Sequence, residues 1–150
     1  MRSFTYSIHI ERSPEQVWHY MMDFANAPRW RNLVRQVDVI TKGPLRVGSE
    51  MLVTFDVMGK ARRIVSEVWA FEPARRFGVR NSEHNVTGVF EYTLAPERDG
   101  TRVTFACDIQ PRRLMWVLLP FLVRGNRMRY AEQLPNLKKE VEAGSRQPDA

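Results

Sequence analysis

Residues 114–141 read LMWVLLPFLVRGNRMRYAEQLPNLKKEV and carry apolar or small residues at intervals of three or four. These positions are Leu114, Leu118, Phe121, Gly125, Met128, Ala131, Leu134, Leu137 and Val141. Such spacing places them on one face of a helix. We therefore predict one long C-terminal helix over about residues 112–142. A bend or break is expected near Pro120 and near Pro135, because each proline removes a backbone hydrogen bond.

The residues before this helix predict consecutive strands, interrupted once by a short helical insert. Apolar and polar residues alternate from residue 4 to residue 10, which is the period of a half-buried strand. Ser13 and Pro14 then mark a helix start, because serine is a preferred N-cap and proline is tolerated at the first helical position. This helix is expected to end near Asp23, and a second short turn of helix follows around Pro28.

Six further strands are predicted between residues 34 and 109. Their approximate ranges are 34–40, 51–57, 62–71, 77–80, 89–94 and 102–109. Alternation of this kind is typical of an antiparallel sheet with one face in water. No other helix is long enough to cover the apolar face of the C-terminal helix, so the sheet must cover it. The fold class is therefore α+β, and the space between sheet and helix is either a packed core or a cavity.

Composition indicates a single globular domain. The 150 residues are 43% hydrophobic, enough for one core, and we expect a domain over residues 1–143 followed by a disordered tail at 144–150. The N-terminal residues lack the apolar block of a signal peptide, and no run long enough to span a bilayer occurs, so a cytoplasmic protein is expected. Cys107 is the only cysteine, which excludes an intramolecular disulfide. It alternates in phase with Val103 and Phe105, so we predict that it packs as a small hydrophobe.

The formal net charge of +6 admits nucleic acid, an anionic membrane surface or acidic small molecules as partners. The basic residues are nevertheless scattered in short pairs, such as Arg62-Arg63 and Lys138-Lys139, without interleaved aromatic residues. A binder of single-stranded nucleic acid typically shows such interleaving. A specific nucleic-acid partner is therefore not expected. Transient contact with a membrane surface stays open, and so does the choice between monomer and homodimer.

Several short motifs, in order, resemble a known family. They are Ile10-x-x-Ser13-Pro14-x-x-Val17-Trp18, Asp23, Pro28-x-Trp30, Val47-Gly48, Glu72-Pro73-x-Arg75-Arg76-Phe77 and Leu134-x-x-Leu137-Lys138-x-x-Val141-Glu142. Together they resemble the polyketide cyclase/dehydrase and lipid-transport group of the START-like, or SRPBCC, superfamily. The resemblance covers roughly residues 4–142. It implies the helix-grip fold, in which a seven-stranded curved antiparallel sheet wraps around a long C-terminal helix, with two short helices between the first two strands.

The resemblance also implies an apolar ligand in the space between sheet and helix, but a fold does not by itself determine a function. We expect a small hydrophobic or amphipathic ligand, such as a lipid, a polyketide or an aromatic compound, held by a carrier, a sensor or a cyclase. A cavity of several hundred Å³ would support this hypothesis, whereas space for a few waters would indicate a solid core. The candidate ligand-binding residues are Trp30, Phe55, Trp69, Phe90, Tyr92, Phe105, Leu118, Phe121, Leu122 and Gly125.

Motifs for covalent or metal chemistry are weak in this chain. The three histidines, His9, His19 and His84, form no metal-binding pair, and the glycines form no phosphate-binding loop, so we expect neither a metal nor a cofactor. If the protein is an enzyme, a cofactor-free cyclase or dehydratase is expected, with Glu67 or His84 as a desolvated acid or base. The alternative is an interaction protein that contacts an anionic membrane surface or a ribonucleoprotein through its basic surface.

Overall fold

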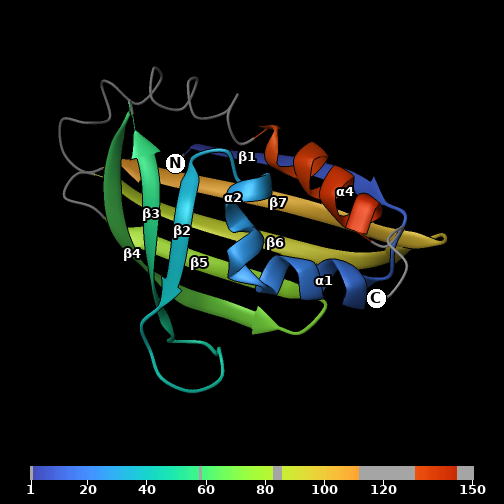
Figure 1. Ribbon diagram of the computed structural model, residues 1–150, viewed down its shortest axis with the longest axis horizontal. Helices are drawn as coiled ribbons and strands as arrows, with labels where there is room; N and C mark the ends of the chain where they lie inside the picture. Colours follow the sequence, from blue (N-terminus) through green and yellow to red (C-terminus); the bar gives the residue numbers. More distant parts are fainter. Residues whose placement is uncertain (1, 58, 83–85, 112–130, 145–150) are drawn as a thin grey trace.

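The computed structural model describes residues 2–57, 59–82, 86–111 and 131–144. Its centre is one seven-stranded antiparallel sheet with the order β1-β7-β6-β5-β4-β3-β2 (Figure 1). The strands are β1 (Arg2–Ile10), β2 (Val34–Val39), β3 (Glu50–Val57), β4 (Lys60–Glu72), β5 (Arg76–Ser82), β6 (Val86–Glu97) and β7 (Gly100–Pro111). The predicted sheet is confirmed, and β4, β5 and β6 are longer than the alternation alone indicated.

The insert between β1 and β2 folds as α1 (Pro14–Met22), a 3₁₀ turn η1 (Phe24–Asn26) and α2 (Ala27–Trp30). Ser13 caps α1 as expected: its hydroxyl accepts from the Gln16 N–H at 3.2 Å, and the Gln16 side chain accepts from the Ser13 N–H at 3.1 Å. This reciprocal pair satisfies donors that a helix start leaves open.

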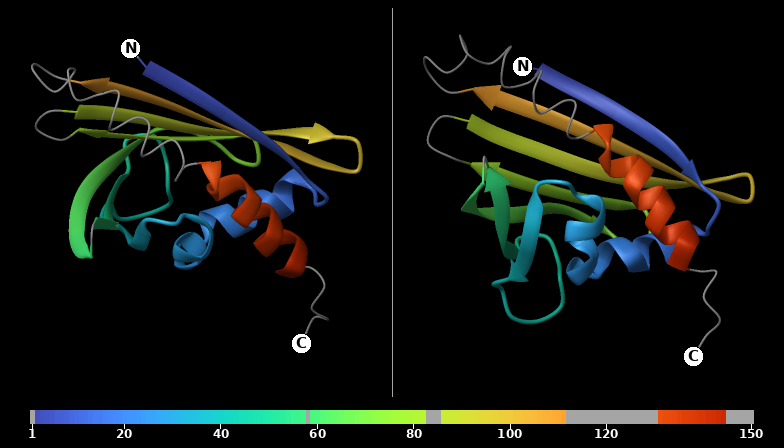
Figure 2. Two further views of the ribbon diagram at one scale, coloured as in Figure 1. Left: turned by 90° about the horizontal axis from the view of Figure 1, so that it is seen from above. Right: turned by 45° about the horizontal axis from the view of Figure 1, so that its top comes forward.

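Helix α4 (Gln133–Gly144) and the short helices lie against one face of the curved sheet (Figure 2). Leu134, Leu137 and Val141 are buried there, as the helical spacing predicted. Pro135 falls in the first turn of α4, where a missing N–H costs little. The rest of the predicted long helix, residues 112–130 with Pro120, lies outside the described residues, as does the predicted tail apart from Gly144.

Alternation correctly assigned the faces of the β6 and β7 strands. Tyr92 and Leu94 of β6 are buried, as are four residues of β7: Val103, Phe105, Cys107 and Ile109. Cys107 is 1% exposed, and burial raises the pKa of its thiol to about 12. It therefore packs as a neutral small hydrophobe, as predicted.

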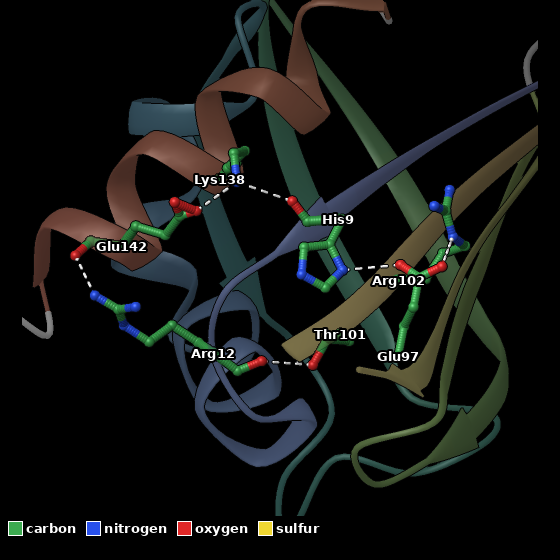
Figure 3. A network of polar contacts seen from close by, with 7 residues as sticks. All are labelled: His9, Arg12, Glu97, Thr101, Arg102, Lys138 and Glu142. Carbon is green, nitrogen blue, oxygen red and sulfur yellow. Dashed lines mark hydrogen bonds and ion pairs between the residues drawn. The ribbon is translucent and has the colours of Figure 1, made fainter. Parts of the chain in front are cut away.

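A network of polar contacts fastens α4 to the sheet (Figure 3). Arg12 donates to the Glu142 carbonyl oxygen at 2.8 Å, close to the C-terminus of α4, where a cation is favourable. Lys138 donates to the His9 carbonyl oxygen at 3.0 Å and pairs with the Glu142 carboxylate at 2.6 Å. Thr101 donates to the Arg12 carbonyl oxygen at 2.7 Å. We call this set of five residues the α4 latch.

Candidate ligand-binding site

Aromatic side chains gather on the concave face of the sheet, beneath the helices. The ring centroids of Tyr92 and Phe105 are 4.8 Å apart, and Phe90 stacks on Phe105 at 6.3 Å. Trp30, the last residue of α2, meets Tyr92 edge-on at 5.5 Å. Neighbouring strands thus present a continuous aromatic surface, and α2 covers part of it.

Next to this surface is a hollow of about 30 Å³. Its lining comes from η1, β2, β3, β4, β5, β6 and the residue after α2: Phe24, Arg31, Val37, Met51, Val53, Phe55, Ser66, Phe77, Val79, Asn81, Phe90 and Tyr92. Eight of these twelve residues are apolar, which is typical of a small-molecule site. The volume holds about one or two waters, far below the roughly 300–1,000 Å³ of such sites. By the size criterion given for the sequence, the described hollow indicates a packed core and not an open cavity, so a ligand can enter only by displacing lining side chains.

Tyr92 links the hollow to α4. Its hydroxyl donates to the Gln133 side-chain oxygen at 2.6 Å, and both residues are buried. Burial raises the pKa of Tyr92 to about 12, although the nearby charge of Arg31 acts in the opposite direction. At neutral pH the phenol is therefore protonated, so Tyr92 can donate a hydrogen bond but does not act as a base.

Polar groups without partners lie at the hollow and beside it. The Arg31 Nε and the Trp30 Nε1 are buried, and neither has a hydrogen-bond partner. Ser66 of β4 and Asn81 of β5 are directly paired across the two strands, and both side chains line the hollow. Buried donors are seldom left unpaired in folded proteins, so this arrangement needs an explanation.

The structure brings three of the predicted ligand-binding residues, Phe55, Phe90 and Tyr92, to the hollow. Trp30 and Phe105 pack against Tyr92 instead of lining the hollow. Leu118, Phe121, Leu122 and Gly125 lie outside the described residues, and so does His84.

Trp69, expected on the concave face, lies on the opposite face. The register shifts between Val68 and Ala70, which leaves Trp69 as the extra residue of a β-bulge. A Cβ on Gly78 would come within 2.6 Å of the indole, so the ring fills the space that glycine leaves open. Arg76 stacks on the ring at 4.8 Å from its centroid. Trp69 therefore does not line the hollow, in contrast to the expectation from the sequence.

Glu67 is not a desolvated acid. Its carboxylate pairs with Arg80 at 3.4 Å, and the two side chains are 48% and 50% exposed. The two residues are direct cross-strand partners, outside the hollow. Glu67 therefore lacks the burial that its predicted catalytic role requires.

Sequence reasoning missed several lining residues. Phe77, Val79, Met51 and Val53 lie on strand faces that alternation points inward, so that signal was present. Arg31 follows a four-residue helix in a segment without periodicity, and nothing in its local sequence marks it. Among the described residues, no group of three or more His, Cys, Asp or Glu side chains is placed to hold a metal ion. No described helix is long and apolar enough to cross a membrane.

The family described as polyketide cyclase/dehydrase and lipid transport matches residues 1–142 of this chain. The chain belongs to this family. None of the curated proteins matches it significantly.

Many solved structures have the same fold as this chain. TTHA0849 from Thermus thermophilus is 20% identical, with a TM-score of 0.76 over 96% of this chain and 99% of that one. The Zhui aromatase/cyclase from Streptomyces sp. R1128 is 16% identical, with a TM-score of 0.73 over 94% and 93%. A START superfamily protein from Mycobacterium smegmatis is 12% identical, with a TM-score of 0.73 over 94% and 97%. The helix-grip fold predicted from the sequence is therefore confirmed.

Proposed function

We propose that this protein binds a small hydrophobic or amphipathic molecule between the concave face of the sheet and its helices. The observation that carries the proposal is the make-up of the hollow's lining, not its volume: eight residues are apolar and four are polar, namely Arg31, Ser66, Asn81 and Tyr92. Membership of a polyketide cyclase/dehydrase and lipid-transport family supports it.

Binding is a better account of the described lining than turnover. No described lining residue is Asp, Glu, His or Cys, and Tyr92 stays protonated at neutral pH. General-base chemistry needs a group that accepts a proton near the operating pH. The solved structure named as an aromatase/cyclase shares the fold at 16% identity, and for this chain we propose a ligand site and not that reaction.

The test uses N-phenyl-1-naphthylamine, a neutral probe whose fluorescence rises in apolar surroundings. We expect saturable binding to the wild type, displaced by decanol. Phe55→Ala removes a ring from the hollow and is expected to weaken binding roughly tenfold. The matched control is Val65→Ala, which truncates an apolar side chain that is 46% exposed and away from the hollow.

The salt dependence of binding distinguishes this proposal from the alternative, in which a basic surface contacts an anionic membrane or a ribonucleoprotein. The affinity for a neutral ligand hardly changes between about 50 mM and about 500 mM salt, whereas the affinity for phosphate groups falls steeply. Absence of saturable probe binding, or equal losses in the two alanine variants, would contradict the proposed site. Strong, salt-sensitive binding to anionic vesicles without probe binding would favour the alternative.

A further inference from the structure

Arg31 is the one cationic residue among the described lining residues of the hollow. It is the C-cap residue of α2, in an extended conformation with φ −102° and ψ 101°. Both backbone groups of Arg31 are hydrogen-bonded. Its N–H donates to the Ala27 carbonyl at 2.9 Å, and its carbonyl accepts from the Val34 N–H at 3.0 Å. The backbone thus holds this side chain at the hollow.

Among the described residues, the Nε of the Arg31 guanidinium meets no acceptor. This Nε is buried, and no ion pair joins Arg31 to another described residue. No acidic side chain is among the described lining residues, so its charge is not neutralised within the hollow. Other arginines of the chain do find partners: Arg76 pairs with Glu91 at 2.6 Å, and Arg102 with Glu97 at 2.7 Å.

A buried, unpaired guanidinium donor beside an apolar surface is the complement of an amphipathic anion. An arginine binds a carboxylate through parallel N–H donors in a fixed geometry, and such charged hydrogen bonds are stronger than neutral ones. The rest of the lining is apolar except for Ser66, Asn81 and Tyr92. An acidic head is therefore the chemical complement of Arg31, and an apolar body is the complement of the rings of Phe55 and Phe90 once lining side chains have moved apart.

We infer that Arg31 is the anchor for a ligand with a carboxylate, or an equivalent anionic oxygen, on an apolar body. This inference rests on the proposed function and names the chemical class of its ligand. Both an aliphatic acid and an aromatic acid have this chemistry. The Ser66 and Asn81 pair offers further hydrogen bonds to a polar group along the body of the ligand.

The experiment compares acids with neutral alcohols of matched size. Decanoate is paired with decanol, and 2-naphthoate with 2-naphthalenemethanol, each displacing N-phenyl-1-naphthylamine at neutral pH. We expect the wild type to bind at least one acid about ten- to a hundredfold more tightly than its alcohol, which is the range of one charged hydrogen bond. The pair with the larger preference identifies the aliphatic or the aromatic source.

Arg31→Gln is expected to remove this preference while leaving the affinity for the alcohols unchanged. Arg31→Lys keeps the charge but loses the forked donors, so an intermediate preference is expected. The matched control is Arg29→Gln, an exposed residue of the same helix whose loss changes the net charge equally. Thermal melts of all three variants verify that they are folded.

The outcomes separate the two claims. Equal binding of acids and alcohols by the wild type, or an acid preference that survives in Arg31→Gln, would overturn the role of Arg31 and leave the hydrophobic site intact. Equal loss of preference in Arg29→Gln would also overturn it, because net charge alone would then be the cause. Failure of the wild type to bind the neutral probe and the alcohols would reject the proposed function itself.

Discussion

The two ends of the concave face differ in how their polar side chains are satisfied. In the α4 latch, donors of Arg12, Lys138 and Thr101 each meet an acceptor within 3.0 Å. At the hollow, the buried Nε of Arg31 meets none. Buried donors are almost always paired in native structures. The latch is therefore explained by folding alone, whereas the unpaired Arg31 donor at the hollow is not.

The largest effect is expected from two phenylalanines that stack on each other. Phe105 is 1% exposed in the core, whereas Phe90 is partly buried and lines the hollow. Phe105→Ala should lower the free energy of unfolding by about 3–5 kcal/mol, because the cavity that it leaves is enclosed. Phe90→Ala should cost roughly half of that, because less area leaves water on folding. Urea unfolding measures both values.

The two alanine variants also distinguish an effect on stability from an effect on ligand binding. Phe90→Ala is expected to weaken the binding of N-phenyl-1-naphthylamine, although it destabilises the protein less. Similar losses of stability in both variants would mean that the hollow is part of the packed core. The difference in packing between the core and the hollow would then not include the aromatic side chains.

A smaller effect is expected from two arginines with opposite surroundings. Arg12→Met removes the donor to the Glu142 carbonyl at the end of α4 and should cost about 1–3 kcal/mol. Arg31→Met removes a donor without a partner and should leave stability unchanged or raise it by up to about 1 kcal/mol. Thermal unfolding of the ligand-free variants measures the difference. A loss in Arg31→Met equal to that in Arg12→Met would show that Arg31 serves the fold.

A similar comparison, between regular and irregular strands, explains how much of the fold could be predicted from the sequence. Unbroken alternation in β6 and β7 predicted the inward face correctly, because each residue there pairs in a regular register. In β4 the bulge after Val68 changes the phase, so Phe71 packs on Trp18 and Phe77 while Trp69 lies on the outer face. A bulge is one extra residue without a sequence signature of its own, and alternation cannot detect it.

The candidate site was less predictable than the fold for a related reason. Apolar residues repeat along strands, so the rings at the hollow could be foreseen from their period. Arg31 follows a helix of four residues, and its position depends on how α2 sits against the sheet. Glu67 was expected to be buried, but it forms an exposed ion pair with its cross-strand neighbour Arg80. Only the strand register reveals this pair.

The smallest effect is expected when the latch end is titrated with acid. Hydrogen bonds from Arg102 and His9 lower the pKa of Glu97. Burial acts to raise the pKa of Glu142, but the hydrogen bond and charge of Lys138, with help from the Glu11 backbone and Arg12, lower it overall. A carboxyl group with a lowered folded pKa stabilises the fold above its unfolded pKa, near 4.3, and loses that contribution as the pH falls.

Stability should therefore fall as the pH drops below about 5, and part of this fall belongs to the latch. Glu142→Gln breaks the ion pair with Lys138, whose spacing of four residues makes it worth roughly 0.3–0.5 kcal/mol at neutral pH. The variant should differ from the wild type near pH 7 and converge with it in acid. Glu50→Gln removes an exposed carboxylate without an ion pair among the described residues and is the control. Parallel thermal-melt curves for the wild type and Glu142→Gln at every pH would mean that the Lys138 contact does not hold α4. The fastening of α4 would then rest on Arg12 and the apolar residues beneath the helix, because these contacts do not depend on the Glu142 carboxylate.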